Sequence, residues 1–222
     1  MKSAARPVAA MAALLAALFA APINAAEAPV TSAAVWGPPP GFLAHFHRLC
    51  DGRSGNAFTS CFAAAMGKAG ASPQAIAFTR RLDNEAYLQT LDESGGPIAV
   101  AHVVFPFAAN ENNGWFLING TPAQINVDNF RNLDLARMRS SAAYLTIHDN
   151  YRNASFWPGD RGANGPEVMN DGRKFIVGYL LRDLCHACAV IGRVRYAFDF
   201  DQTGKFLGTR LVSVTPVDKP RG

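Results

Sequence analysis

The sequence has few charged residues and lacks the motifs that identify the common classes of enzyme. Charged residues make up 17% of the 222 residues, and no block of clustered Lys or Arg follows residue 26. This absence argues against a nucleic-acid partner or a polybasic membrane patch. The chain also has no G-x-S-x-G elbow, no H-E-x-x-H zinc motif, no phosphate-binding loop and no dinucleotide fingerprint. We therefore predict no catalytic residue, no cofactor and no metal site, and an enzyme is less expected than a binding protein.

Residues 1–26 are predicted to be a signal peptide. Lys2 and Arg6 precede an apolar stretch over 8–21, and Pro22 and small residues up to Ala26 follow it, an order typical of a cleaved export signal. The alternative is an uncleaved anchor, but about 14 apolar residues are fewer than the ~20 of a membrane-spanning helix. Cleavage lowers the formal charge from +4 to +2. We expect export to the periplasm or the extracellular space, with no stable membrane span after cleavage.

The apolar pattern predicts helices first and strands later, after an extended leader at 27–40. Helical spacing predicts helices over 42–50, 58–66 and 73–82, a short fourth helix around 87–91, and a weaker helical region over 130–151. Alternating or β-branched runs predict strands over 98–105, 115–118, 123–127, 175–181, 190–200 and 206–214, with a long loop over 158–172. Residues 41–222 are therefore predicted to form a single α+β domain, with N-terminal helical hairpins packed on an antiparallel sheet and a C-terminal β-meander.

Four cysteines are present, an even number that can pair in an exported protein. Cys50 and Cys61 lie on the apolar faces of consecutive predicted helices, so packing of these faces brings the two sulfur atoms together. We predict a disulfide that joins the two helices and contributes about 3 kcal/mol on the chain-entropy model.

The candidate functional segment is Cys185-His186-Ala187-Cys188. A CxxC with an intervening His also occurs in thiol–disulfide oxidoreductases of the thioredoxin kind, where the first Cys lies at a helix N-terminus. Here the segment lies between two predicted strands, and residues i and i+3 of a β-turn approach within the range of a disulfide. We predict a structural disulfide between Cys185 and Cys188, with a redox-active pair or half of a metal site as alternatives.

The histidines show no metal-binding pattern. His45 and His47 point to different sides of a helix, His102 is expected to be a satisfied core or edge residue of a strand, and His148 and His186 are isolated in the sequence.

The run from Asp199 to Gly204 resembles the nucleophile loop of haloacid-dehalogenase-like phosphatases and the first half of an EF-hand calcium loop. In the phosphatases a large α/β domain follows the loop, whereas 18 residues follow Gly204 here. An EF-hand needs a bidentate Glu at the position of Arg210. We predict a polar hairpin turn between two strands.

The Cys185–Cys188 run also resembles an uncharacterised family of exported bacterial proteins, together with Phe198-Asp199-Phe200, Gly204 to Gly208 and Phe105-Pro106-Phe107. The resemblance implies export and one domain over most of the mature chain, and no known activity. The leading hypothesis is a non-catalytic binding or accessory protein with an unknown protein or small-molecule ligand in the cell envelope. The alternatives are a thiol–disulfide redox protein using Cys185 and Cys188, and a metal-binding protein using the same segment.

Overall fold

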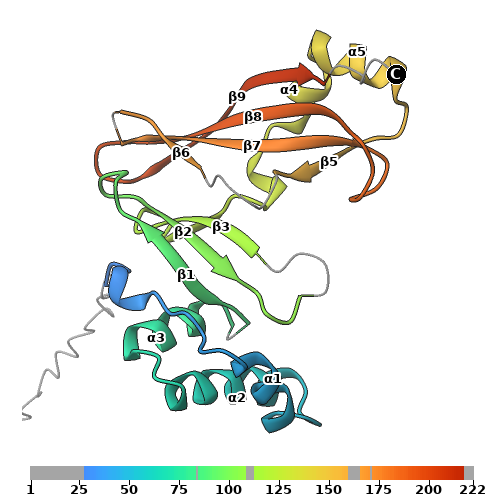
Figure 1. Ribbon diagram of the computed structural model, residues 1–222. Helices are drawn as coiled ribbons and strands as arrows, with labels where there is room; N and C mark the ends of the chain where they lie inside the picture. The colour runs from blue at the N-terminus through green and yellow to red at the C-terminus, as the bar shows by residue number, and fades with distance from the viewer. Residues whose placement is uncertain (1–27, 84, 109–112, 160–165, 171, 218–222) are drawn as a thin grey trace, which may run out of the picture.

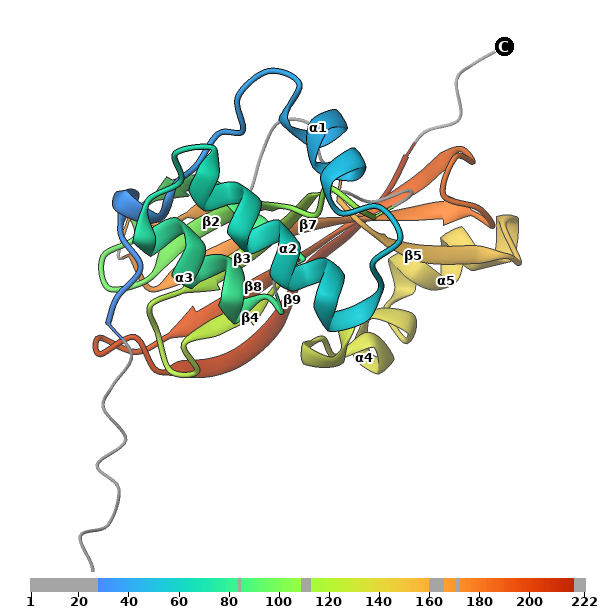
Figure 2. The ribbon, with the colours of Figure 1, turned by 90° about the horizontal axis from the view of Figure 1, so that it is seen from below.

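The computed structural model describes residues 28–217 except 84, 109–112, 160–165 and 171, and its described part is an α+β fold. Helices η1 (Ser32–Ala34), α1 (Phe42–Leu49), α2 (Gly55–Lys68) and α3 (Pro73–Arg81) form a layer on one side of a first antiparallel sheet. That sheet has the order β1 (Tyr87–Asp92), β2 (Ala99–Val104), β3 (Asn113–Ile118) and β4 (Gln124–Asn126). Figure 1 shows that the helices and the second sheet lie on opposite sides of the first sheet, and Figure 2 shows the helical layer from below.

The second sheet contains the C-terminal meander. Its strands are β5 (Ala154–Pro158), β7 (Lys174–Asp183), β8 (Val190–Phe200) and β9 (Phe206–Pro216), and β6 (Glu167–Val168) pairs with β7. The linking segment between the sheets holds η2 (Phe130–Asn132), α4 (Leu135–Arg139) and α5 (Ala142–Asn150). The predicted loop over 158–172 lies partly outside the described residues, and its described part includes β6.

The three predicted N-terminal helices are confirmed. Ser72 begins α3, where its Oγ accepts a hydrogen bond from the Ala75 amide at 2.9 Å, and Pro73 occupies the first turn. Phe46 of α1 and Phe62 of α2 are fully buried against each other, with ring centroids 5.2 Å apart. The predicted Cys50–Cys61 pair lies at the end of this contact, with the two Cα atoms 6.1 Å apart.

The prediction of a fourth helix around residues 87–91 is wrong, because these residues form strand β1, antiparallel to β2. The pairing register shifts between Leu88 and Thr90, so Tyr87 and Leu88 are both buried although they are adjacent. A bulge of this kind breaks the alternation of a strand. It places apolar residues at 87, 88 and 91, a spacing that resembles one turn of a helix.

The sequence predicted one antiparallel sheet, whereas the described strands form two sheets that share a core. Phe175 and Phe198 of the second sheet pack in one cluster with Val100 and Leu117 of the first. The Tyr179 hydroxyl crosses this core and donates to the backbone oxygen of Val127 at 2.7 Å. Strand pairing joins segments far apart in the chain, so the division into two sheets has no local signature.

The predicted leader is extended apart from η1, and it is packed rather than detached. Val30 and Trp36 are buried. The Val30 amide donates a hydrogen bond to Asn119 Oδ1 at 2.7 Å, and Asn119 Nδ2 donates to the Val30 carbonyl at 2.8 Å. The Trp36 amide donates to the Leu88 carbonyl, which fixes the leader beside β1.

Candidate functional site

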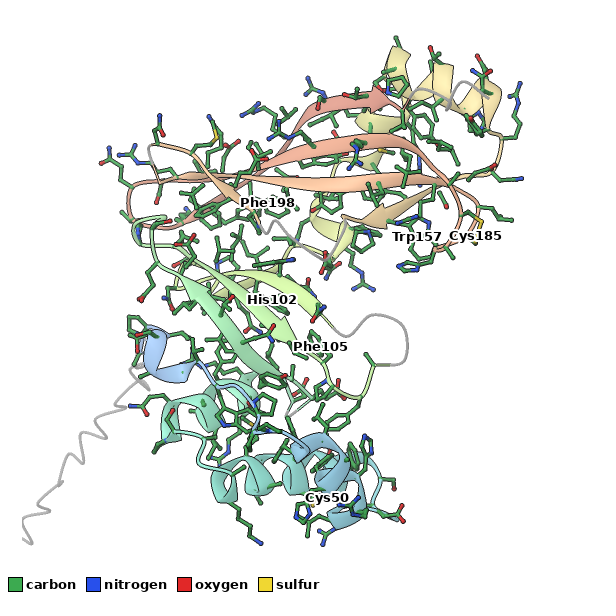
Figure 3. All side chains as sticks on the ribbon, viewed as in Figure 1. Cys50, His102, Phe105, Trp157, Cys185 and Phe198 are labelled. Atoms are coloured by element: carbon green, nitrogen blue, oxygen red, sulfur yellow. A yellow bond between two sulfur atoms is a disulfide. The ribbon has the colours of Figure 1, made fainter. Side chains whose placement is uncertain are left out.

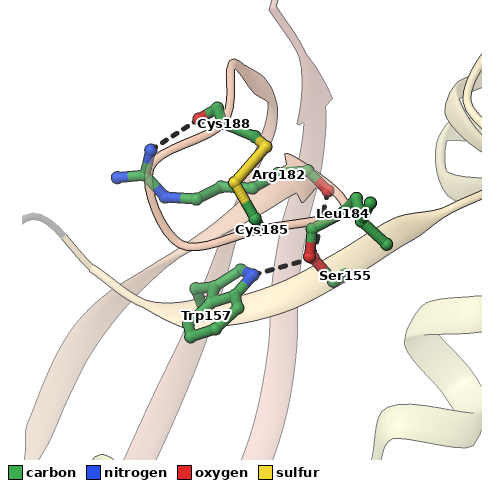
Figure 4. Close-up of a disulfide and its surroundings, with 6 residues drawn as sticks. All are labelled: Ser155, Trp157, Arg182, Leu184, Cys185 and Cys188. Carbon is green, nitrogen blue, oxygen red and sulfur yellow. Dashed lines mark hydrogen bonds between the residues drawn. A yellow bond between two sulfur atoms is a disulfide. The ribbon is translucent and has the colours of Figure 1, made fainter.

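The predicted hairpin at Cys185–Cys188 is present and joins β7 to β8 (Figure 4). The Cys188 amide donates to the Cys185 carbonyl at 3.0 Å, the hydrogen bond of a β-turn. The two Cα atoms are 5.0 Å apart and the sulfurs are bonded. Residues 183–200 are all described, and the motif is followed by strand β8 rather than by a helix.

Neighbouring strands hold the hairpin in place through polar contacts. Ser155 of β5 donates through its Oγ to the Leu184 carbonyl at 2.8 Å and accepts from the Trp157 indole at 2.7 Å. The Arg182 guanidinium donates to the Cys188 carbonyl at 2.9 Å. Leu184 has a positive φ of 78°, the left-handed conformation that turns the chain away from β7. These groups order the turn from both sides, as Figure 4 shows.

An aromatic and cationic surface surrounds the disulfide. Trp157 is half-buried, and its ring lies 5.2 Å from that of exposed His186. Figure 3 shows Trp157 and Cys185 together at one end of the second sheet. Trp157 pairs with Leu180, which pairs with Arg193, so these three side chains lie in a row on one sheet face. We call Trp157, Arg182, His186 and Arg193 the hairpin surface.

The Cys185–Cys188 turn lacks the helix N-terminus that usually activates the first thiol of a redox-active pair. A redox-active CxxC has its first Cys at a helix N-terminus, where the dipole stabilises the thiolate. In residues 183–200, Cys185 instead lies at the end of a β-ribbon, and its turn leads into β8. The geometry therefore supports a cross-link that shapes the turn, while the exposure of Cys185 leaves the disulfide accessible to reductants.

No histidine joins the two cysteines to form a metal site within the described residues, where no group of three or more His, Cys, Asp or Glu is placed to hold a metal ion. His102 stacks on Trp115, with centroids 4.5 Å apart, on the first sheet (Figure 3). The expectation that His102 is satisfied is wrong, since its Nε2 is buried and no described group bonds it. Burial lowers the pKa of His102.

The run from Asp199 to Gly204 forms the predicted hairpin turn. Asp201 Oδ1 accepts hydrogen bonds from the Thr203 amide, the Thr203 hydroxyl and the Lys205 amide at 2.7–2.9 Å. These hydrogen bonds lower the pKa of Asp201, led by that from the Thr203 side chain. The carboxylate is thus used to close the turn between β8 and β9.

No family model, no curated protein and no solved structure matches this chain. Two cysteine pairs at bonding distance are typical of an oxidising, extracellular environment. In the part of the chain that the structure describes, none of the helices has both the length and the apolar character needed to cross a membrane.

Sequence reasoning missed the contribution of β5 to the hairpin surface. No predicted element covers residues 152–157, although Ala154 to Pro158 contains the short alternation of a strand. Ser155 and Trp157 face the hairpin, whereas Phe156 points into the core and stacks on Tyr179 at 5.0 Å. Alternation along this segment was the signal that could have identified Trp157.

Proposed function

We propose that this chain is an exported, non-catalytic binding protein that recognises an envelope partner through the hairpin surface. The observation that carries the proposal is the arrangement of Trp157 and His186 beside a disulfide that closes a β-turn. A half-exposed Trp beside a rigid turn is a favourable anchor for a partner, because little conformational entropy is lost when it becomes buried.

The charge of the hairpin surface supports a partner with acidic groups. Arg193 is exposed on the same sheet face as Trp157. The neighbouring Arg195 forms an ion pair with Glu167, so this part of the face is locally neutral. A carboxylate-bearing partner would therefore contact Arg193 next to the aromatic pair.

Site-specific photo-crosslinking in the native envelope tests this proposal. A benzoyl-phenylalanine in place of His186 should give one discrete adduct, and the same group in place of Leu145, which is 50% exposed on α5, should not. Arg193→Glu should reduce the adduct several-fold, while Arg48→Glu, at an exposed position of α1, provides the matched charge reversal far from the site. Equal adducts from both positions, or equal effects of both reversals, would refute the proposed surface.

Cysteine variants distinguish the proposed binding protein from a thiol–disulfide redox protein. Cys188→Ser leaves a single Cys185 thiol, which in a redox protein would accumulate a mixed disulfide with its substrate. We expect no such species. In the Cys185→Ser, Cys188→Ser double variant we expect the crosslinked adduct to persist, because the Asp183 amide still bonds the Ala189 carbonyl across the turn at 3.1 Å. Loss of function together with a trapped mixed disulfide would favour the redox protein.

A further inference from the structure

A small cavity lies between α2 and the segments that precede β1 and follow β2, in the helical half of the molecule. Its volume is about 230 Å³. The residues that line it come from three distant segments: Phe58, Thr59, Glu85, Phe105, Phe107 and Ala108. Figure 3 shows Phe105 at the end of β2, far from the hairpin surface at Cys185. This cavity, which we call the phenylalanine pocket, is separate from the proposed partner-binding surface.

Aromatic rings form the walls of the phenylalanine pocket. Phe58 and Phe107 meet edge to face, with ring centroids 4.8 Å apart. Phe107 also packs on the fully buried Phe46 at 5.0 Å, which holds its ring in place. Phe58, Phe105 and Phe107 all remain half-buried, so part of each ring borders the cavity. Ring faces carry partial negative charge and attract cations.

The lining combines one carboxylate with aromatic rings, which suits a cation with an apolar body. Of the six lining residues that the structure describes, Glu85 is the one with a charge, and its side chain is exposed at the rim. The Thr59 hydroxyl donates to the Asn56 carbonyl at 3.2 Å and is thereby engaged within α2. A carboxylate beside three aromatic rings complements a positive charge on an apolar body.

We propose that the phenylalanine pocket binds a small methylated ammonium ion. A quaternary ammonium is weakly hydrated and contacts aromatic faces within about 6 Å, whereas a primary ammonium would lose hydrogen bonds that the three phenylalanines do not replace. The volume of about 230 Å³ is below the ~300–1,000 Å³ of sites for drug-sized ligands, which restricts the ligand to a few heavy atoms. Glu85 balances the ligand charge at the entrance.

Calorimetric titration of the mature chain with choline tests the inference. The comparison ligand is 3,3-dimethyl-1-butanol, a neutral molecule of the same shape in which carbon replaces the charged nitrogen. We expect saturable binding of choline, at least about fivefold tighter than the neutral molecule, because the cation–π and carboxylate contacts depend on the charge. Equal affinities, or no binding of choline at millimolar concentration, would overturn the inference.

Paired variants place the binding in the phenylalanine pocket. Glu85→Gln should weaken choline binding about fivefold, and Glu93→Gln, the same change at an exposed site in the β1–β2 turn, should leave it unchanged. Phe105→Leu should weaken choline binding without affecting the neutral molecule to the same degree, with a thermal melt to verify folding. Equal effects of the two Glu variants would overturn the proposed site. Neither outcome changes the crosslinking at residue 186, so this inference and the proposed function fail separately.

Discussion

Graded reduction is expected to open the Cys185–Cys188 disulfide before the Cys50–Cys61 disulfide. A thiolate must approach a sulfur atom along the disulfide axis, so access controls the rate. Cys50 has no exposed surface and lies in the aromatic cluster of α1 and α2. Cys185 lies on the exposed tip of the β7–β8 hairpin. The two disulfides therefore differ in accessibility within the same folded chain.

The two disulfides also differ in what their loss costs. They span 11 and 3 residues, and on the chain-entropy model these loops contribute about 3 and about 2 kcal/mol. For a domain of this size 1 kcal/mol corresponds to roughly 2–4 °C in Tm. Opening Cys185–Cys188 should thus lower Tm by about 4–8 °C. The fold should persist, because β7 and β8 remain paired from Lys174 to Arg182.

Thiol trapping under native conditions measures this order. The protein is incubated with increasing dithiothreitol, quenched with a maleimide, and digested so that mass spectrometry assigns the modified cysteines. Modification at residues 185 and 188 should precede that at 50 and 61, and the Cys185→Ser, Cys188→Ser variant should resist modification over the same range. Earlier or simultaneous modification of residues 50 and 61 would refute the argument from burial.

Three further predictions concern the core between the sheets. Burial lowers the pKa of His102 below 6.5, so the unfolded chain binds a proton at this residue more readily than the folded chain. The urea midpoint of unfolding should therefore fall as pH drops below about 6.5, and His102→Leu should reduce this fall. Tyr179→Phe leaves the Val127 carbonyl without its donor, which should cost about 1–3 kcal/mol in urea unfolding; an unchanged midpoint would contradict this. Gly120→Ala places a Cβ 2.6 Å from a backbone oxygen and should destabilise the fold by about 1–3 kcal/mol, while Gly37→Ala, with open space around it, should change little in the same assay.

Local sequence signals were sufficient to predict elements in both the N-terminal and the C-terminal parts of the described chain, such as α3 and β8. Ser72-Pro73 marked the start of α3, and the alternation from Val190 to Phe200 marked β8, because caps and side-chain period depend on near neighbours. Strand β1 was missed because its bulge depends on pairing with β2. The division into two sheets was missed for the same reason: contacts such as Tyr179 with Val127 join residues 52 positions apart.

The candidate sites show the same contrast between features that neighbouring residues define and features that depend on contacts between distant segments. The Cys185–Cys188 turn was predictable because four consecutive residues define it. Trp157 joins it only through the pairing of β5 with β7. The phenylalanine pocket combines residues from three segments: 58 and 59, 85, and 105, 107 and 108. His102 appeared satisfied from its strand pattern, but a hydrogen-bond partner for its Nε2 depends on what the second sheet brings near it.

Both proposed binding surfaces lie next to a disulfide, away from the core between the sheets. Trp157 and His186 flank Cys185–Cys188, and Phe58 precedes Cys61 by three residues on α2, almost one helical turn. The shared core is held by packing across the two sheets and contains neither disulfide. Oxidation therefore stabilises the surfaces more than the core. It follows that reduction of Cys50–Cys61 should weaken choline binding in the phenylalanine pocket at concentrations of reductant that leave the two-sheet core folded, whereas the adduct at residue 186 should persist because the Asp183 amide still bonds the Ala189 carbonyl.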